Sequence, residues 1–241
     1  MAEKIARGRK LSMLSPLGAH VSTAGGYEQA ITRAESLGCT AFQIFTKSNR
    51  QWHGKAITAQ EASLFRSTLT QSPIKPQHLT AHATYLINIG SAKPDLLAKS
   101  RAALIDELTR CDLLGIPSLV LHPGSATEST EKECLARISE SLELVLNTAP
   151  GSTKILLEIM AGQGSSVCYR FEHLAQVLSN TSRRDRLGVC IDTCHIFAAG
   201  YDLRTPERYQ ETWRQFDEVV GINTIGAFHL NDSKKGARQP R

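Results

Sequence analysis

Side chains that can bind a metal ion recur at regular intervals along this sequence of 241 residues. From His82 to His122 is 40 residues, Glu158 follows 36 residues later, Asp192 34 residues after that, and His229 a further 37. Imidazole and carboxylate ligands suit Zn²⁺, with Mn²⁺ or Fe²⁺ as alternatives. The spacing predicts a metal centre to which successive repeated units contribute one ligand each.

Three more candidates accompany this series: His195, just past Asp192, is a further candidate ligand, and His20 and Asp232 are candidates for contacts that support the ligands. One histidine at such a position could equally bond a neighbouring carbonyl group. Several histidines in register with two acidic groups are different, because a desolvated carboxylate is costly unless it is paired with a cation or donors. The candidates outnumber the needs of one ion, so at least two ions are expected. Two ions suit phosphoester hydrolysis, and Glu158, midway in the series, is the candidate bridging and catalytic carboxylate.

The elements that must position these residues are short apolar runs alternating with longer amphipathic stretches. The pattern predicts strands at 14–21, 41–46, 78–83, 118–125, 154–162, 187–195 and 224–232. It predicts helices at 25–38, 58–71, 94–114, 129–147, 170–180 and 205–219. Strict alternation with apolar strands indicates a parallel sheet with helical crossovers. No GxGxxG or P-loop follows a strand, which favours a TIM (β/α)8-type barrel, whose functional groups gather at the C-terminal strand ends.

Composition places the chain among ordinary globular proteins, with 41% hydrophobic and 21% charged residues. We expect a single barrel domain over 1–241, with a flexible lead-in at 1–13 and an irregular basic tail at 233–241. The net charge of +5 is compatible with a polyanionic partner without establishing one. No apolar run is long enough for a membrane span and no secretion signal is evident, so a cytoplasmic location with reduced cysteines is predicted.

Six segments of the sequence carry a resemblance to a known family. They occur in collinear order between Leu17 and Lys234: GAHVSxAGG (18–26), FTKxxRQW (45–52), HxxYLIN (82–88), HPGS (122–125), CIDTCHxFAAGYD (190–202) and HLND (229–232). Together they resemble the endonuclease IV family of apurinic/apyrimidinic (AP) endonucleases. The resemblance implies a barrel with up to three zinc ions, in a bacterial-type monomeric enzyme that acts at the nucleoid.

The resemblance also implies a reaction and assigns ligands. The family cuts double-stranded DNA on the 5′ side of abasic sites and leaves a 3′-hydroxyl and a 5′-deoxyribose phosphate. By position, His82, His122 and Glu158 match the ligands of the first ion. Glu158 also bridges to a second ion, which Asp192 and His229 hold.

DNA contacts are expected on two loops. The loop after the second strand offers Lys47, Arg50 and Trp52, and Tyr85 and Leu86 follow the third strand. A cation and an apolar wedge at one rim suit a protein that opens a duplex and takes a nucleotide out of the stack. By residue type alone, the tyrosine and leucine are more often rim packing, whereas the resemblance assigns them to DNA penetration.

The sequence departs from the family pattern after HLND. No Asp-x-His pair follows, so the third ion has only His195, and no final strand supplies a glutamate for the second ion. Ile159 and Met160 stand where the family usually has small polar residues. The prediction is a barrel without its eighth strand and last helix, with impaired activity. Two alternatives stay open, a sugar isomerase or epimerase of the same barrel class and an inactive fragment.

Overall fold

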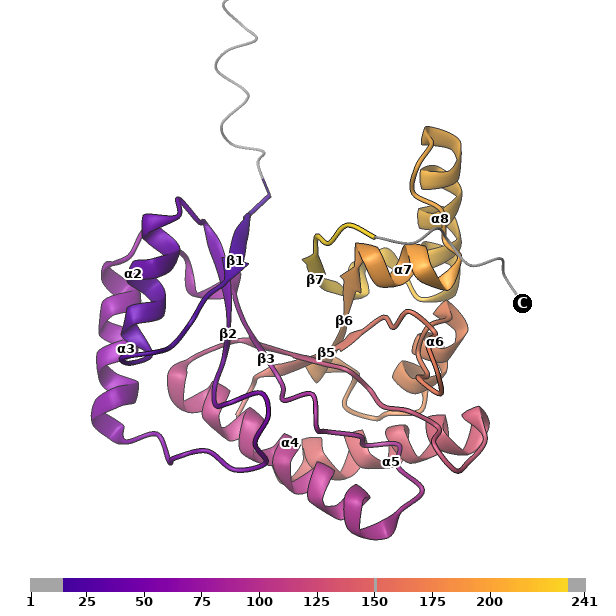
Figure 1. Cartoon of the computed structure of the whole chain (residues 1–241), viewed down its shortest axis with the longest axis horizontal. Helices are drawn as coiled ribbons and strands as arrows, with labels where there is room; N and C mark the ends of the chain where they lie inside the picture. Colours follow the sequence, from indigo (N-terminus) through magenta and orange to yellow (C-terminus); the bar gives the residue numbers. More distant parts are fainter. Residues whose placement is uncertain (1–14, 150, 234–241) are drawn as a thin grey trace, which may run out of the picture.

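Seven parallel strands form the centre of the computed structural model, which describes residues 15–149 and 151–233. The strands pair strictly in chain order (Figure 1): β1 Gly18–His20, β2 Ala41–Phe45, β3 Leu79–His82, β4 Ser118–Leu121, β5 Lys154–Glu158, β6 Leu187–Asp192 and β7 Ile225–His229. The lead-in at 1–13 lies outside the described residues, as does the predicted tail apart from Ser233.

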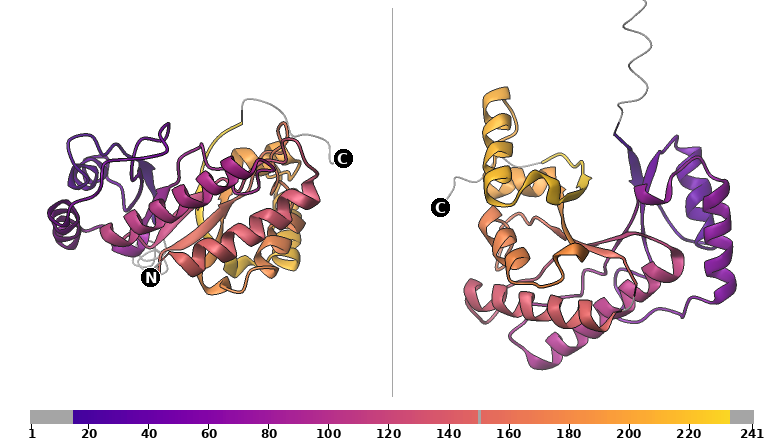
Figure 2. Two further views of the ribbon diagram at one scale, coloured as in Figure 1. Left: turned by 90° about the horizontal axis from the view of Figure 1, so that it is seen from below. Right: turned by 180° about the vertical axis from the view of Figure 1, so that it is seen from behind.

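Helices connect the strands and cover the outer face of the curved sheet (Figures 1 and 2). They are α2 Glu28–Ser36, α3 Ala59–Gln71, α4 Pro94–Leu114, α5 Glu131–Thr148, α6 Phe171–Ser179, α7 Thr193–Ala199 and α8 Pro206–Val219. Short 3₁₀ helices precede β3, β6 and β7: η1 Pro76–His78, η2 Arg184–Arg186 and η3 Ile222–Thr224. In the part of the chain that the structure describes, no helix is long and apolar enough to cross a membrane.

The sequence explains where two of the longer helices begin and how α4 ends. Thr58 and Thr130 cap α3 and α5, and a glutamate three residues later completes a capping box in each case. Helix α4 ends at Gly115, whose φ of 74° lies in the left-handed region that glycine adopts without strain.

Apolar side chains fill the space on both faces of the sheet. The larger core lies between the strands and the helices and includes Phe42 and Ile44 of β2. A smaller cluster of Val120, Leu156 and Cys190 lies on the other face. Burial on both faces explains why the strand segments are apolar throughout, as parallel sheets require.

The sheet is an incomplete barrel in the described residues. Strands β1 and β7 each have one strand partner and do not pair with each other. Figure 1 shows the ribbons of β1 and β7 apart from each other. The predicted barrel fold without an eighth strand is therefore confirmed for these residues.

Several predicted strand ends were wrong. The predicted strand 187–195 ends at Asp192, and the chain enters α7, a helix that the sequence analysis did not predict. The cause is local: the Asp192 side chain accepts a hydrogen bond from the His195 backbone N–H at 2.9 Å and caps the helix. The predicted strands 14–21, 118–125, 154–162 and 224–232 were also too long.

Candidate metal centre

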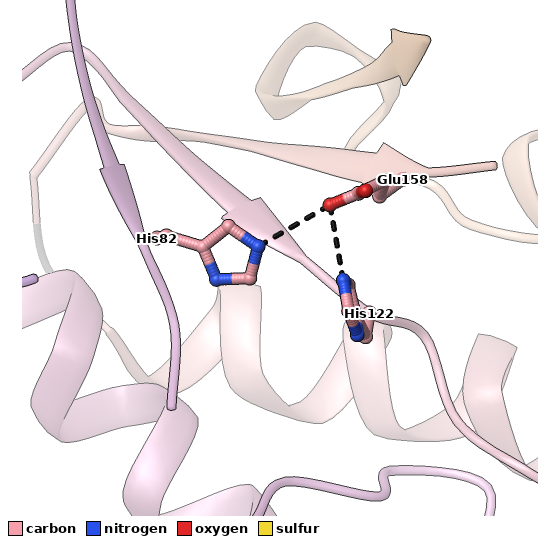
Figure 3. Close-up of side chains that lie close together, drawn as sticks. All are labelled: His82, His122 and Glu158. Carbon is pink, nitrogen blue, oxygen red and sulfur yellow. Dashed lines mark hydrogen bonds and ion pairs between the residues drawn. The ribbon is translucent and has the colours of Figure 1, made fainter. Parts of the chain in front are cut away.

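Glu158 lies at the centre of the predicted ligands and touches four imidazole rings. Its Oε2 atom is 3.2 Å from His82 Nε2 and 3.2 Å from His122 Nε2 (Figure 3). Its Oε1 atom is 3.1 Å from His195 Nδ1 and 3.4 Å from His229 Nδ1. The side chain of Glu158 is only 2% exposed. The sheet thus brings four of the other five predicted metal ligands around this one buried carboxylate.

The strand ends position these imidazole rings, and contacts with backbone carbonyl groups orient two of them. His82 ends β3, His122 is the first residue after β4, and Glu158 ends β5. Nδ1 of His82 lies 2.7 Å from the Ala83 carbonyl oxygen, so the ring presents Nε2 to Glu158. His195 reaches the cluster from the first turn of α7, with Nδ1 also 3.0 Å from the Ile159 carbonyl oxygen.

Asp192, the sixth predicted ligand, lies buried at the end of β6. While Oδ1 caps α7, Oδ2 accepts a 2.6 Å hydrogen bond from Asn231 Nδ2 and is 3.9 Å from His229 Nδ1. Asn231 is fixed in turn, because its backbone N–H donates to Thr193 Oγ1 and its carbonyl accepts from the same hydroxyl. The sequence analysis missed Asn231, although it stands inside the HLND segment.

The side chains form three groups of potential metal donors, whose ligand atoms lie within 4.8 Å of one another: His82 with His122 and Glu158, Glu158 with Asp192 and His195, and Glu158 with Cys190 and His229. Glu158 belongs to all three. Its nitrogen and oxygen partners are the donor set that Zn²⁺ takes in hydrolytic sites, so the residues fit the predicted ion. Cys190 is buried, and burial raises the pKa of its thiol well above the ordinary value, which favours a packed thiol over a ligand.

Electrostatics at Glu158 also favour a cation. Burial by itself raises the pKa of this carboxyl group, but hydrogen bonds with the four imidazoles outweigh it and hold the pKa below its ordinary value. The group is therefore a buried anion ringed by nitrogen donors. A divalent cation matches this arrangement because it compensates the buried charge.

A row of polar side chains runs beside the cluster on β1, β2 and β3. His20, Gln43 and Thr80 are cross-strand partners. Gln43 Nε2 is 3.1 Å from His20 Nδ1, and Gln43 Oε1 accepts from Thr80 Oγ1 at 3.1 Å and lies 3.0 Å from His229 Nε2. Burial, with His82 and His229 nearby, lowers the pKa of His20 to about 4. The sequence analysis did not single out Gln43.

The residues predicted to contact DNA divide into exposed and buried ones. Arg50 is exposed, and Tyr85 is 54% exposed, with ring centroids 5.1 Å from His82 and 5.3 Å from His122. Leu86 is half-buried beside it. The tyrosine ring therefore stands over the first donor group, where a bound substrate would meet it.

Lys47 faces away from the rim on which it was predicted to contact DNA, and Asp232 stays a prediction. The Lys47 ammonium is buried, 2.5 Å from Asp106 Oδ2 and 3.5 Å from Glu107 Oε1, so it faces α4 and not the rim. Asp232 is exposed, and its Oδ1 accepts a hydrogen bond from the Ser233 backbone N–H. Neither side chain joins the donor groups among the described residues.

A hollow of about 630 Å³ opens next to the cluster, between the loops that follow β1 and β2. Its lining includes His20 and Phe45 and the polar residues Ser22, Thr23, Ser48 and Asn49. It gives the rim a polar recess beside the exposed Tyr85.

Comparisons with known proteins agree with this site. A family model described as a xylose isomerase-like TIM barrel matches residues 31–241, which defines the class of the protein. The chain is 46% identical over 227 residues to a protein from Chloroflexus aurantiacus described as probable endonuclease 4, covering 93% of this chain and 79% of that protein. The chain belongs to the endonuclease IV family, and the family resemblance is confirmed.

Solved structures show the same relationship. The crystal structure of endonuclease IV from Thermus thermophilus matches with a TM-score of 0.80 at 36% identity, covering 92% of this chain and 78% of that one. D-psicose 3-epimerase from Clostridium cellulolyticum matches with a TM-score of 0.62 at 15% identity, covering 88% and 84%. The second match shows a shared fold alone.

Proposed function

We propose that this protein is a zinc-dependent AP endonuclease that hydrolyses the phosphodiester bond 5′ to abasic sites in double-stranded DNA. The products are a 3′-hydroxyl and a 5′-deoxyribose phosphate. The observation that carries the proposal is the buried Glu158 carboxylate, shared by three donor groups on a rim that also presents an exposed tyrosine. Family membership supplies the substrate class.

Each side chain has a part in this reaction. His82, His122 and Glu158 would hold the first ion, and Asp192 and His229 would hold a second that shares Glu158, with His195 beside them. When bound, zinc lowers the pKa of a coordinated water and neutralises charge on the phosphoryl oxygens. Burial of Glu158 keeps bulk water from competing for the ligands, and the backbone contacts of His82 and His195 fix their ring orientations.

The rim supplies the contacts to DNA. Arg50 is exposed, directly after Asn49 of the polar hollow, and can pair with phosphates, while Tyr85 and Leu86 offer an apolar wedge beside His82 and His122. An abasic nucleotide has no base to unstack, so it is displaced from the helix more easily than an intact one. Selectivity for the lesion would follow from this lower cost of displacement.

The proposal includes a cellular setting. Relatives in Chloroflexus and Thermus are bacterial, and the six cysteines are free thiols, four of them buried. We place the protein in the bacterial cytoplasm, where thiols stay reduced, acting as a monomer on nucleoid DNA.

The test is incision of a labelled duplex that contains one abasic site, with the protein reconstituted in zinc. We expect a single cut 5′ to the lesion with a 3′-hydroxyl end, and no cut in an undamaged duplex. Metal stoichiometry and a thermal melt are measured on the same sample. A folded, metal-loaded chain that leaves the duplex intact would refute the proposal. Conversion of a ketose sugar by that sample would instead favour the epimerase alternative.

A further inference from the structure

Gln43 links two strands that are not neighbours in the sheet. Its side chain lies on β2, yet its Oε1 atom reaches His229 Nε2, on β7, at 3.0 Å. These strands are not neighbours in the sheet, because β2 pairs with β1 and β3 and β7 pairs only with β6 among the described strands. The amide therefore spans the mouth of the open sheet from one side to the other.

The other contacts of the amide fix which end faces His229. Gln43 Nε2 faces His20 Nδ1 at 3.1 Å, and Gln43 Oε1 also accepts from Thr80 Oγ1 at 3.1 Å. Since His20 and Thr80 are the register partners of Gln43 on β1 and β3, the amide is held between two strands. The carbonyl end is thereby directed toward β7.

This orientation determines where His229 carries its proton. An amide oxygen can only accept, so the ring nitrogen that faces it must be Nε2–H. The other nitrogen, Nδ1, then turns to the carboxylates, 3.4 Å from Glu158 Oε1 and 3.9 Å from Asp192 Oδ2. A histidine that ligates a metal is generally oriented by a hydrogen bond from its other ring nitrogen.

We propose that Gln43 is a positioning residue for the second metal, which fixes the ring and tautomer of His229 through the hydrogen bond from Nε2–H to its Oε1. Two other histidines of the cluster are oriented by backbone carbonyl groups. His82 Nδ1 lies next to its neighbour's carbonyl oxygen, and His195 Nδ1 lies next to that of Ile159. His229 sits on an edge strand and receives its orienting contact from a side chain on the opposite flank.

Two variants of Gln43 separate the oxygen end of the amide from the rest of the side chain. Gln43→Leu keeps approximate volume and removes both polar ends. Gln43→Glu keeps an acceptor for Nε2–H and removes the donor to His20. Gln77→Ala, at an exposed position in η1, is the control. Zinc binding is followed as two steps by competition with a chromophoric chelator, and His229→Ala identifies the step that belongs to the second ion.

We expect Gln43→Leu to weaken the second step by about 10- to 100-fold and to leave the first step unchanged, as is typical when the partner of a ligating histidine is lost. Gln43→Glu should stay near wild type, because a carboxylate accepts from an imidazole N–H at least as well as an amide does. If Gln43→Leu binds both ions as wild type does, the inference is wrong. Equal weakening of both steps in Gln43→Leu and Gln43→Glu would also overturn it, because that result indicates general loosening of the rim.

A second measurement does not depend on affinity or activity. In the zinc-loaded protein, the ¹⁵N-labelled ring of His229 should show a slowly exchanging proton on Nε2 in wild type and Gln43→Glu. Exchange of that proton should accelerate in Gln43→Leu. A proton on Nδ1, or unchanged exchange in Gln43→Leu, would count against the inference.

The inference rests on the proposed metal centre but not on DNA cleavage. A chain that shows two zinc steps and the expected effect of Gln43→Leu, yet fails to cut abasic DNA, would refute the proposed function alone. A chain that cuts abasic DNA while Gln43→Leu leaves the second zinc step and the His229 proton unchanged would refute the role of Gln43 alone.

Discussion

The two flanks of the metal cluster are held in different ways. On the β1–β3 flank, charged side chains of α4 reach under the loops: Glu107 accepts from Thr46 Oγ1 at 2.5 Å and from the Thr84 backbone N–H at 3.3 Å. Arg110 donates to the Thr46 carbonyl oxygen, and Lys47 pairs with Asp106 and Glu107. On the β6–β7 flank, the rim is held by hydrogen bonds with uncharged side chains: Thr193 and Asn231 donate, and Gln43 accepts from His229.

The two flanks differ because the charged side chains of the first lie beneath the loops, whereas the side chains of the second contact the candidate metal ligands directly. The loop from β2 to α3 is long, so it needs anchors at its base, and a fully paired buried ion network can supply them. Beside Asp192 and His229, an extra cation would compete with the metal for the carboxylates. Amide and hydroxyl groups can orient the ligands there without carrying that charge. The structure thus has charged side chains beneath the loops and neutral hydrogen-bonding side chains beside the candidate ligands.

The centre that both flanks share gives the largest expected effect. Glu158→Gln keeps the shape of the side chain and removes its charge from all three donor groups. We expect this change to lower incision of abasic DNA by about 10³-fold, since metal catalysis contributes several kcal/mol to transition-state stabilisation. Metal content by mass spectrometry should fall as well. Glu172→Gln, at an exposed position on α6, is the control, and full zinc content in Glu158→Gln would contradict the prediction.

Lys47→Met removes the buried cation of the β1–β3 flank. It leaves Glu107, whose side chain is 1% exposed, without its cation, and removing one partner of a buried pair costs about 3–5 kcal/mol. The free energy of unfolding, measured in urea on the metal-free protein, should fall by about that amount. Lys55→Met, at a lysine whose side chain is 83% exposed, should change it by less than about 0.5 kcal/mol. Equal stability of the two variants would show that the network does not anchor the fold.

Asn231→Ala tests the hydrogen bonds of the β6–β7 flank. It removes one hydrogen bond to Asp192 in a partly exposed position, so we expect a stability loss of only about 1 kcal/mol. Affinity for the second zinc should fall by about tenfold, because the carboxylate loses its orienting partner. Asn223→Ala, in the exposed turn η3, is the matched control. The comparison of flanks fails if Asn231→Ala destabilises the fold more than Lys47→Met does.

Arg50→Ala tests an exposed cation on the β1–β3 flank, in contrast to the buried Lys47. An exposed arginine that contacts phosphate should weaken duplex binding modestly and reduce the slope of log affinity against log salt by about 1. Thermal stability should not change. Arg208→Ala, on the exposed face of α8, should leave the salt slope as in wild type. An unchanged slope in Arg50→Ala would remove Arg50 from the DNA surface.

The smallest expected effect concerns His20. Its pKa is lowered to about 4, so the folded chain takes up this proton later than the unfolded chain does as pH falls from the ordinary value of 6.5. The contribution of neutral His20 to stability is complete above 6.5 and is lost progressively as pH falls toward 4. An NMR titration of the metal-free protein should place the midpoint of His20 near 4, and His20→Gln should flatten this part of the stability curve. A midpoint near 6.5 would contradict the lowered pKa of His20.

Much of the rim could be predicted from the sequence because parallel strands end at one edge. A residue type that recurs once per βα unit must gather there, which located His82, His122, Glu158 and His229 without any contact information. Six helices were predictable because amphipathic stretches alternate with the apolar strand segments. The short helix α7 was not, because CIDTCH is apolar enough to continue a strand, and only the Asp192 cap stops it.

Contacts between elements that lie far apart in the chain could not be predicted from the sequence. Lys47 belongs to a cationic loop, and nothing local indicates that two acidic residues of α4, which lie 59 and 60 positions later, pair with it. Gln43 stands within a run of strand-forming residues, where one polar residue has no evident purpose. Its role depends on a register that aligns it with His20 and on a gap that β7 faces, and both are properties of the assembled sheet.

Four imidazoles gathered on a single carboxylate also set how the centre takes up its ions. In the proposed centre, a metal would bind the lone pairs of these nitrogens in competition with protons. Zinc uptake would then release protons to the surrounding buffer, and its midpoint would shift to higher zinc concentration as pH falls.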